Sequence, residues 1–368
     1  RAPRPFFFSF IRRSKLVAPP RALKPPTHSS RRLTYGLGKE VGSGAPPSAL
    51  AYELVQGPLV KFSEQQADGA GAAPPPTAVL VHGIMGSRRN LLSFAKLLAR
   101  RLPAWQFLLV DLRCHGASAA GAGQSAAAPP PHTTASAAAD VLRLLRELRL
   151  FPNVLIGHSF GGKVVLSMVE QFGGRALPRP VQVWVLDTLP SAGVHGSRND
   201  DDGADHPGRL IKTLRQIPMP TPSRGHVVDA LVQKHGFTVD VANWVVTNMR
   251  TAEAGEVGGR AMGGELRWSF DLSGIDALYD SYEATDLWRV VEHPPLGLDL
   301  NFVRAERSTF RWGGGAEEKI TALGSRVHLL RQAGHWVHSD NPEGLGDIIV
   351  NNITDVTDAP GVQYSAAR

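Results

Sequence analysis

The stretch Val154-Leu155-Ile156-Gly157-His158-Ser159-Phe160-Gly161-Gly162 decides the fold of this chain. It starts as an apolar run of strand length, passes through the pattern G-x-S-x-G and continues into a helix. A serine at a sharp strand-to-helix turn has strained backbone angles, and side chains at the glycine positions would collide with neighbouring elements. The stretch therefore predicts a turn that presents the Ser159 hydroxyl at the carboxyl end of a sheet. The Phe160 N–H at the helix start would face an incoming oxyanion.

Short apolar runs that end at turn residues recur along the chain and indicate buried parallel strands. They cover residues 78–81, 107–110, 154–156, 181–186, 300–303 and 327–330. Two segments between them, residues 91–102 and 135–150, repeat apolar residues every three or four positions, as amphipathic helices do. This alternation predicts an α/β fold with a doubly wound, mostly parallel sheet, and residues 51–55 form a first strand.

Residues 190–295 interrupt this alternation. They contain a Gly/Asp-rich loop at 197–208, a proline-interrupted run at 217–220 and helical stretches near 227–233 and 239–250. A segment of this length is too long for a simple connection between two core strands. It therefore predicts a helical cap, inserted after strand six, that covers the site.

A serine hydroxyl is a poor nucleophile until a base takes its proton, so the turn requires a histidine from elsewhere in the chain. His335 fits best, because it directly follows the last predicted strand, at the same edge of the sheet as Ser159. His338 is a competitor that lies one helical turn later. His158 is expected to point behind the serine.

The acid that orients the imidazole has two candidates. Asp187 stands at the end of one predicted strand and Glu306 follows the next, and both give the chain order serine, acid, histidine. Asp187 is favoured because it comes immediately at a carboxyl strand end. Glu306, the second choice, lies between Arg304 and Arg307 and is explained as a surface ion pair.

The oxyanion hole needs a second backbone donor besides Phe160. The glycine turn at residues 82–87 follows a predicted strand and supplies one, with Ile84 as first choice and Met85 next. An ordinary βα turn would have the same sequence, so this assignment depends on Ser159.

No motif indicates a metal or a nucleotide. The run Asp111-Leu112-Arg113-Cys114-His115-Gly116-Ala117-Ser118 also ends a strand, and a structural turn explains it best. The chain has no H-E-x-x-H, no paired-cysteine motif and no phosphate-binding glycine pattern that follows a strand. We therefore expect no metal and no cofactor.

Several motifs together resemble the α/β-hydrolase fold serine esterases of the alpha/beta-hydrolase domain-containing protein 11 family. The resemblance covers about residues 50–355 and rests on the turn 82–87 with Asn90, the run 111–118, His132-Thr133, residues 157–161, residues 186–191 and Gly334-His335-Trp336.

The resemblance implies hydrolysis of carboxylic esters or thioesters through an acyl-enzyme, without a metal or an organic cofactor. In that family the acid position after the seventh strand often carries no carboxylate, and Ser308 stands there in this chain. The resemblance thus supports Asp187 as the acid. The chain departs from the family in its Gly/Ala-rich insert, residues 119–131, and in the Asp-rich loop of the cap.

The large side chains of the cap bear on the substrate. Met219, Trp244, Met249 and Trp268 suggest a small-molecule ester with an apolar acyl group or a lipid, although such residues serve packing at least as often. Three alternatives remain open: an acyltransferase, a cofactor-independent lyase of the same fold and a non-catalytic member that binds a ligand or protein.

Composition excludes several classes of protein. The chain has 368 residues and a formal charge of +7, but ten of its 40 bases lie in residues 1–39, which contain no acid. Removing these ten leaves 30 bases against 33 acids, so the basic charge does not mark a nucleic-acid-binding face. The single cysteine excludes an intramolecular disulfide, and no run approaches the roughly 18 apolar residues of a membrane-spanning helix.

The N-terminal extension, residues 1–45, is rich in Arg, Ser, Pro and Ala and free of acids up to Glu40. This composition is typical of an organellar transit peptide, which predicts import into a mitochondrion or chloroplast. A disordered basic tail on a cytoplasmic protein is the alternative. Residues 46–355 would then form the folded domain, and residues 356–368 a C-terminal tail.

Overall fold

The computed structural model describes residues 50–60, 74–119, 130–172, 180–193, 205–252, 264–308, 312–313 and 315–353. These residues all belong to one unit, Pro47–Arg368. The predicted transit peptide, the C-terminal tail and most of the insert at 119–131 lie outside the described residues.

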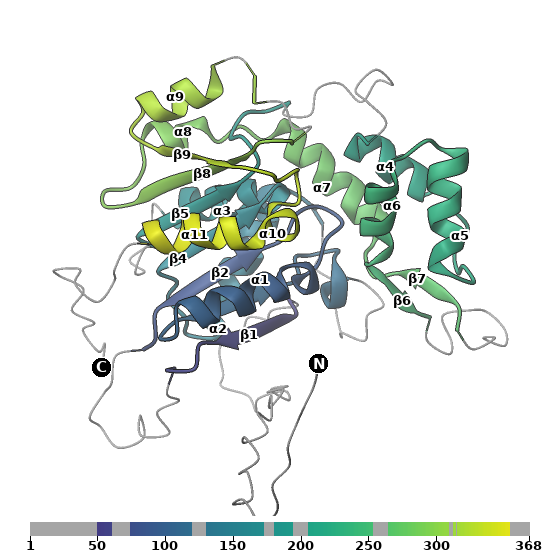
Figure 1. Ribbon diagram of the computed structural model, residues 1–368, viewed down its shortest axis with the longest axis horizontal. Helices are drawn as coiled ribbons and strands as arrows, with labels where there is room; N and C mark the ends of the chain where they lie inside the picture. Colours follow the sequence, from purple (N-terminus) through teal and green to yellow (C-terminus); the bar gives the residue numbers. More distant parts are fainter. Residues whose placement is uncertain are drawn as a thin grey trace, which may run out of the picture. The chain divides into compact units, whose positions relative to one another are not determined.

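A seven-stranded sheet lies at the centre of the described residues, in the order β1-β3-β2-β4-β5-β8-β9 (Figure 1). The strands are β1 (Tyr52–Gln56), β2 (Thr77–Val81), β3 (Gln106–Val110), β4 (Val154–His158), β5 (Gln182–Leu186), β8 (Asp299–Ala305) and β9 (Arg326–Leu330). β1 pairs antiparallel with β3, and every other pair is parallel. The doubly wound, mostly parallel α/β-hydrolase sheet predicted from the sequence is confirmed.

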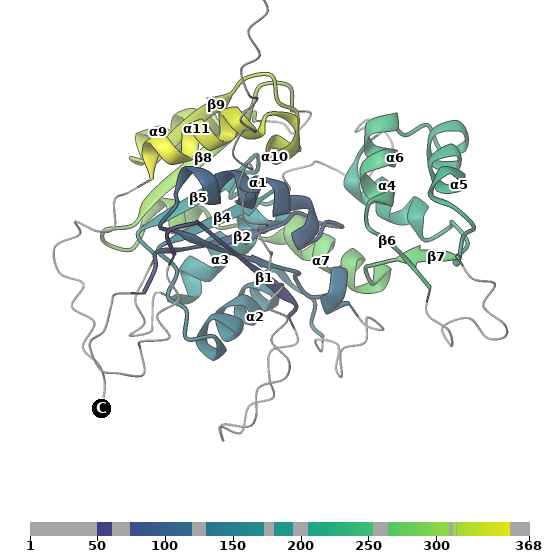
Figure 2. The same cartoon turned by 60° about the horizontal axis from the view of Figure 1, so that its bottom comes forward.

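Helices cover both faces of the sheet, as the two views in Figures 1 and 2 show. One face carries α1 (Arg88–Arg101), α10 (Val337–Asp340) and α11 (Pro342–Asn352); the other carries α2 (Thr134–Glu147), α3 (Phe160–Phe172) and α9 (Ala316–Ala322). Successive strand residues alternate between the two cores: Leu80 and Ile156 pack under α1, whereas Val81 and Leu155 pack under α3. The short 3-10 helix η2 (Gly116–Ser118) follows β3.

The last strand differs from its prediction as a buried strand. β9 lies at the edge of the sheet, and its residues are mostly half-buried or exposed, with Leu329 47% exposed. An edge strand pairs on one side only, so it has less cover than the central strands β2, β4 and β5, in which every residue is buried.

The segment between β5 and β8 forms the predicted cap. Its elements are α4 (Pro207–Leu214), α5 (Arg224–Asp229), the π-helical turn η3 (Ala230–Lys234), α6 (Val239–Val246), β6 (Met249–Thr251), β7 (Leu266–Trp268), α7 (Leu272–Ala284) and α8 (Trp288–Glu292). β5 is the fifth strand among the described residues, whereas the prediction numbered the preceding strand as six. α7 contacts both α2 and α3, and thereby attaches the cap to the core.

Apolar residues of the β6–β7 hairpin contribute to the buried core of the cap. Met249 and Trp268 face each other across the antiparallel β6–β7 pair, and both are buried. These two residues therefore serve packing within the cap. None of the described helices combines the length and the apolar character needed to cross a bilayer.

Candidate active site

Ser159 stands at the turn between β4 and α3 with a left-handed backbone, φ 53°. Non-glycine residues rarely adopt this conformation, and here it is held by neighbouring hydrogen bonds. The Ser159 N–H donates to the Leu186 carbonyl at 2.9 Å, and the Ser159 carbonyl accepts from the Gly162 N–H at 2.8 Å. Ser159 is 5% exposed, so its side chain sits in an enclosed site.

The flanking glycines are required by close backbone contacts. A Cβ on Gly157 would lie 2.1 Å from the Gly161 carbonyl oxygen, and one on Gly161 would lie 2.4 Å from the Val81 carbonyl oxygen. Both contacts are with backbone, which cannot give way cheaply. The turn therefore exists in this form only with glycines on both sides of the serine.

Asp187 and His335 are brought together although 148 residues separate them. His335 Nδ1 lies 2.8 Å from a carboxylate oxygen of Asp187. The His335 carbonyl in turn accepts a hydrogen bond from His158 Nε2 at 2.6 Å, which ties the histidine loop to the residue before Ser159. The Nδ1 contact places the ring proton on Nδ1, so that Nε2 is the basic nitrogen of the neutral imidazole.

The Asp187 carboxylate is fully buried and well supplied with donors. Like Ser159, Asp187 has a left-handed backbone, φ 50°. Besides His335, the Ala305 N–H and the Trp312 indole N–H donate to one oxygen, and the Ser308 hydroxyl donates to the other. Such hydrogen bonds stabilise a buried carboxylate in its charged form. Ser308, which stands at the alternative acid position, therefore serves as a donor to Asp187.

Glu306, the second-choice acid, has other partners. One of its carboxylate oxygens accepts from the Gln332 N–H at 2.8 Å, and the other lies 3.7 Å from the Arg331 guanidinium. These contacts hold the loop after β9, which carries His335 further along. Glu306 thus serves the loop, and it is Asp187 that contacts His335.

The candidate oxyanion loop, residues 82–87, is fixed by two buried histidines. The Met85 N–H donates to His115 Nε2 at 3.0 Å, and the Leu112 N–H donates to His82 Nε2 at 3.1 Å. Burial lowers the pKa of both histidines below the ordinary value, so both rings are neutral acceptors. Among the described residues, the Ile84 and Phe160 N–H groups have no acceptor, whereas the Met85 N–H is occupied.

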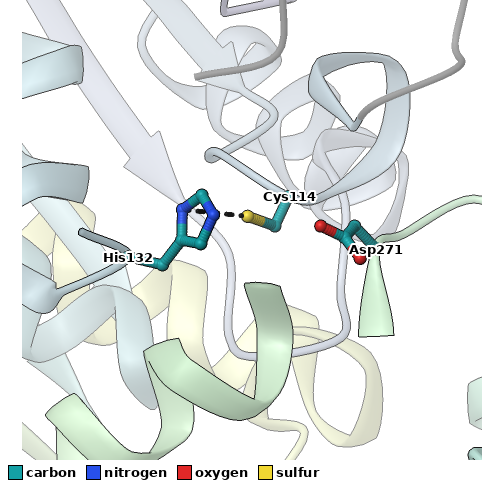
Figure 3. Close-up of side chains that lie close together, drawn as sticks. All are labelled: Cys114, His132 and Asp271. Carbon is teal, nitrogen blue, oxygen red and sulfur yellow. Dashed lines mark hydrogen bonds between the residues drawn. The ribbon is translucent and has the colours of Figure 1, made fainter. Parts of the chain in front are cut away.

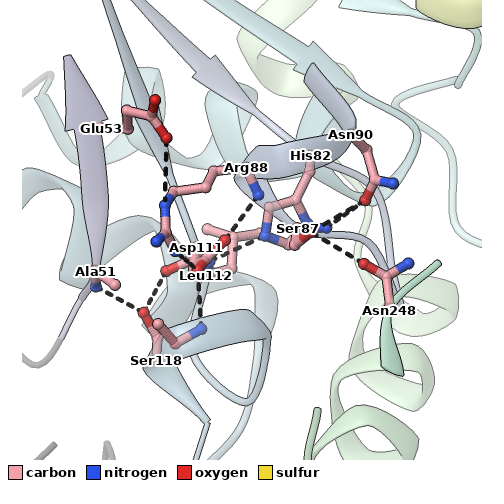
Figure 4. A network of polar contacts seen from close by, with 11 residues as sticks. Ala51, Glu53, His82, Ser87, Arg88, Asn90, Asp111, Leu112, Ser118 and Asn248 are labelled. Carbon is pink, nitrogen blue, oxygen red and sulfur yellow. Dashed lines mark hydrogen bonds and ion pairs between the residues drawn. The ribbon is translucent and has the colours of Figure 1, made fainter. Parts of the chain in front are cut away.

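Asp111 anchors the other side of this loop, as Figure 4 shows. Its carboxylate accepts from the Arg88 N–H at 2.7 Å and the Ala117 N–H at 2.9 Å, and it forms an ion pair with the Arg88 side chain. The Ser118 hydroxyl donates to the Asp111 carbonyl at 2.7 Å. The run 111–118 is therefore a structural turn, as the sequence predicts.

Two further histidines surround His335 without replacing it. The His158 ring lies 4.9 Å from the rings of His335 and His338, measured between centroids. Burial lowers the pKa of His158 well below its ordinary value and that of His338 to about 4. Both are buried, neutral neighbours of His335, whose own side chain is 23% exposed.

Tyr282, on α7 of the cap, places a hydroxyl beside Ser159. Its hydroxyl lies 2.7 Å from the Thr188 hydroxyl. Burial raises the pKa of Tyr282 far above its ordinary value, and hydrogen bonds with Thr188 and Ser159 offset this only in part. Tyr282 is therefore a neutral hydroxyl at the site, and sequence reasoning missed it because nothing in its local sequence marks it.

A buried lysine holds this part of the cap on the helix that follows Ser159. The Lys163 ammonium donates to the carbonyls of Ser191, Tyr282 and Thr285 at 2.6 to 2.9 Å and lies 4.3 Å from the centre of the Tyr282 ring. Burial lowers the pKa of Lys163 to about 8. The cap and the serine-bearing helix are thus joined through one charged side chain.

The aromatic residues of the cap divide into two groups. Trp244, on α6, lies 5.2 Å from Trp336, the residue after His335, measured between ring centroids. Met219 is partly buried against the same core. Trp244 is therefore the cap tryptophan that reaches the histidine loop, whereas Met249 and Trp268 pack inside the cap.

Comparison with known proteins gives consistent matches. The model of the Alpha/beta hydrolase family matches residues 78–348. The sn-1-specific diacylglycerol lipase ABHD11 of Xenopus tropicalis is 36% identical over 289 residues, 76% of this chain and 79% of that protein. The protein of the same name from Mus musculus is 26% identical over 288 residues, 76% of this chain and 82% of its own length.

A solved structure agrees at the level of the fold. A marine microorganism esterase matches with a TM-score of 0.59 and 17% identity, over 82% of this chain and 98% of its own. Because the family model spans most of the chain and agrees with the observed sheet, this chain belongs to the alpha/beta hydrolase family, and its relatives include esterases and lipases.

Proposed function

We propose that this chain is a serine hydrolase that cleaves carboxylic esters of an apolar, lipid-like substrate through an acyl-enzyme. The observation that carries the proposal is the 2.8 Å contact between His335 Nδ1 and Asp187, at the sheet edge where Ser159 adopts its left-handed turn. A buried carboxylate, an oriented imidazole and a serine at a sharp strand-to-helix turn are the three parts of a nucleophilic triad.

In the first step, the Ser159 hydroxyl attacks the acyl carbonyl while His335 Nε2 takes the hydroxyl proton. Asp187 holds the ring in the correct tautomer and stabilises the imidazolium that forms. His335 then gives the proton to the leaving alcohol, which departs and leaves the acyl group on Ser159. Water, activated by the same imidazole, attacks the acyl-enzyme and releases the acid.

The negative charge of the tetrahedral intermediate needs two donors. The backbone N–H groups of Phe160 and Ile84 are the candidates, and the occupied Met85 N–H favours Ile84 over it. Each such donor contributes roughly 3 to 4 kcal/mol to transition-state stabilisation in known cases. The neutral His115 has an indirect role: it accepts the Met85 N–H and so holds the loop that carries Ile84.

The names of the relatives support a substrate class. Two relatives that match over three quarters of this chain are named sn-1-specific diacylglycerol lipases. We therefore propose the sn-1 ester of a diacylglycerol as the first substrate to test. The apolar side chain of Trp244 beside Trp336 is consistent with a site for an acyl chain.

The test combines a probe and a substrate on the full chain. A fluorophosphonate probe reports an activated serine, and diacylglycerols labelled at either sn-1 or sn-2 report which ester is cut. We expect stoichiometric labelling and preferential release of the sn-1 acyl group. Ser159→Ala should abolish both, whereas Ser308→Ala, which removes one donor to Asp187 but keeps the nucleophile, should slow the labelling without abolishing it.

The outcomes separate the competing functions. Labelling that persists in Ser159→Ala would refute this serine as the nucleophile. Labelling without release of acid, together with transfer of the acyl group to an added alcohol, would assign an acyltransferase. A folded protein that binds diacylglycerol but neither labels nor turns over would be a ligand-binding member of the family.

Residues 1–45, which lie outside the described residues, support a second and separate proposal, import into a mitochondrion or chloroplast. The support is compositional: ten bases and no acid in residues 1–39. Fusing residues 1–45 to a fluorescent reporter tests it. Organellar fluorescence is expected, and a reporter that stays in the cytosol would refute it.

A further inference from the structure

Three side chains of metal-ligand type meet away from the Asp187–His335 contact. The Cys114 thiol, a ring nitrogen of His132 and a carboxylate oxygen of Asp271 all lie within 4.8 Å of one another (Figure 3). Cys114 Sγ and His132 Nδ1 lie 3.5 Å apart. Cys114 is buried, and the other two residues are half-buried.

Each member is held by backbone geometry of its own. Cys114 lies in the turn after β3 with a left-handed backbone, φ 65°, and its carbonyl accepts the Asp271 N–H at 2.9 Å. Asp271 is the N-cap of α7, where one carboxylate oxygen accepts the Ser273 N–H at 3.0 Å. His132 directly precedes Thr133, the N-cap of α2. The three positions are thus fixed before any ligand arrives.

The first turn of α7 is shaped around the sulfur. A Cβ on Gly274 would lie 2.3 Å from Cys114 Sγ and 3.0 Å from an Asp271 carboxylate oxygen. No side chain other than hydrogen could stand there without displacing the thiol. The absence of a side chain at Gly274 therefore leaves room for the Cys114 sulfur beside the Asp271 carboxylate.

We propose that Cys114, His132 and Asp271 bind one divalent transition-metal ion of the zinc type, with a water as fourth ligand. Tetrahedral zinc with a sulfur at about 2.3 Å and a nitrogen at about 2.0 Å separates those two atoms by roughly 3.5 to 3.6 Å. The Cys114–His132 distance already has this value. The Asp271 oxygen has to approach by no more than about 1.5 Å, which rotation of a half-buried side chain provides.

The charges of the cluster favour a dication. Binding forms a metal–sulfur bond and releases the thiol proton to solvent, after which one thiolate and one carboxylate neutralise the two positive charges. Each bound ion therefore releases one proton.

The location gives the ion a structural rather than a catalytic role. Its ligands come from the turn after β3, the start of α2 and the start of cap helix α7, so the ion would fasten the cap to the core. Binding is therefore expected to stabilise the fold without supplying a step of the reaction. The sequence motifs gave no sign of it, because Cys114 and His132 are 18 residues apart and Asp271 lies far beyond both.

Cobalt(II) is the probe for the test, because a thiolate bound to cobalt gives a charge-transfer absorption band. The chain has one cysteine, so any such band belongs to Cys114. We expect the full-length protein to bind one equivalent of cobalt with this band, to lose the band when zinc is added in excess, and to unfold at a higher temperature with zinc than without.

The variants keep the fold while removing one ligand each. Cys114→Ser should abolish the band, and His132→Gln and Asp271→Asn should each weaken cobalt binding at least tenfold. Asn is as good a helix N-cap as Asp, so Asp271→Asn preserves the start of α7. The matched control is His293→Gln, which removes an exposed histidine after α8 and should leave the affinity unchanged.

Two results would overturn the proposal. A folded wild-type protein that takes up no cobalt at micromolar concentrations has no such site. Cobalt bound without a thiolate band, or with an affinity that follows His293→Gln rather than the three ligand variants, would mean adventitious binding to surface histidines.

Discussion

The carboxyl edge of the sheet and the hairpin of the cap are built in contrasting ways. At the sheet edge, Asp187 is fully buried and accepts hydrogen bonds from four donors. At the β6–β7 hairpin, three buried polar atoms have no hydrogen-bond partner within the described residues: Thr221 Oγ1, Glu265 Oε2 and Trp268 Nε1. The first region is specified by polar geometry, and the second by apolar packing around Met249 and Trp268.

This difference has an energetic meaning. A buried polar atom without a hydrogen-bond partner costs about 1 to 3 kcal/mol. Opening the hairpin to water would satisfy such atoms and recover this free energy. Opening the sheet edge would instead break hydrogen bonds that are already made. The hydrogen bonds to Asp187 therefore hold the sheet edge in place, and we expect the β6–β7 hairpin to open more easily than this edge. Because Ser159 is enclosed, we expect movement of the cap to admit the substrate.

The largest expected effect is on ester turnover, and it comes from a substitution at the carboxyl edge of the sheet. Asp187→Asn leaves the shape of the site unchanged but removes the negative charge and puts the wrong tautomer on His335. The corresponding change in serine proteases lowers kcat by about 10⁴-fold. We expect a loss of that order in ester turnover, measured with a p-nitrophenyl ester at pH 7.5, with little change in KM.

Glu306→Gln is the matched control for that change. Glu306 contacts Gln332 and Arg331 instead of His335, so turnover should stay within about twofold of wild type. If Glu306→Gln lost activity as severely as Asp187→Asn, the assignment of the acid would be wrong.

The sequence predicts the strands and the turn around Ser159 well and the long-range contacts of the site poorly, for a physical reason. Strand-length apolar runs and the glycines around Ser159 are local requirements, and Gly157 and Gly161 meet backbone at 2.1 and 2.4 Å. The donors to Asp187 are different: Trp312 reaches it across 125 residues, and no local pattern records such a distance. Tyr282 and Lys163 escaped notice for the same reason.

The second prediction concerns Lys163, which connects the cap to the helix that follows Ser159. Lys163→Met removes a buried ammonium and leaves the carbonyls of Ser191, Tyr282 and Thr285 without their donor. A buried acceptor that loses its donor costs about 1 to 3 kcal/mol. We expect a loss of this order in the free energy of unfolding, measured by urea denaturation, with two transitions if the cap detaches before the core unfolds.

Lys96→Met serves as the control, because Lys96 is exposed on α1. It should change the free energy of unfolding by less than about 0.5 kcal/mol. A Lys163→Met protein as stable as this control would show that the cap is held by apolar packing alone.

The third prediction uses pH to probe the histidines behind the sheet edge. His338 is buried, its Nδ1 has no partner within the described part of the chain, and burial lowers its pKa to about 4. The unfolded chain binds the proton near pH 6.5, before the folded protein does. Stability is therefore complete above about pH 6.5, falls as the pH drops towards 4, and the His338 contribution to that loss is about 3 kcal/mol.

His338→Gln isolates this contribution. Other buried histidines, His82, His115 and His158, also have lowered pKa values, so the wild-type loss exceeds that from His338 alone. The difference between wild type and variant, taken from urea denaturation at pH 7.5 and pH 4.5, should favour the variant at the lower pH. Parallel losses in the two proteins would contradict the neutral state of His338.

The smallest expected effect on stability comes from removing a hydrogen bond between the cap and the oxyanion loop. The Ser87 hydroxyl donates to the Asn248 side-chain carbonyl at 2.9 Å, and Figure 4 shows this contact next to the His82 and Asp111 network. Asn248 directly precedes the β6–β7 hairpin, so this hydrogen bond connects the hairpin to the oxyanion loop, residues 82–87. Asn248→Ala should cost about 1 kcal/mol in stability.

The effect of Asn248→Ala on kcat and KM shows whether the Ser87–Asn248 hydrogen bond serves the oxyanion loop or only the cap. If the bond only closes the cap, Asn248→Ala raises KM a few-fold and leaves kcat nearly unchanged. If it also positions Ile84, kcat falls instead, because an oxyanion donor acts in the transition state. We expect the first result, because His82, His115 and Asp111 hold the loop independently of the cap.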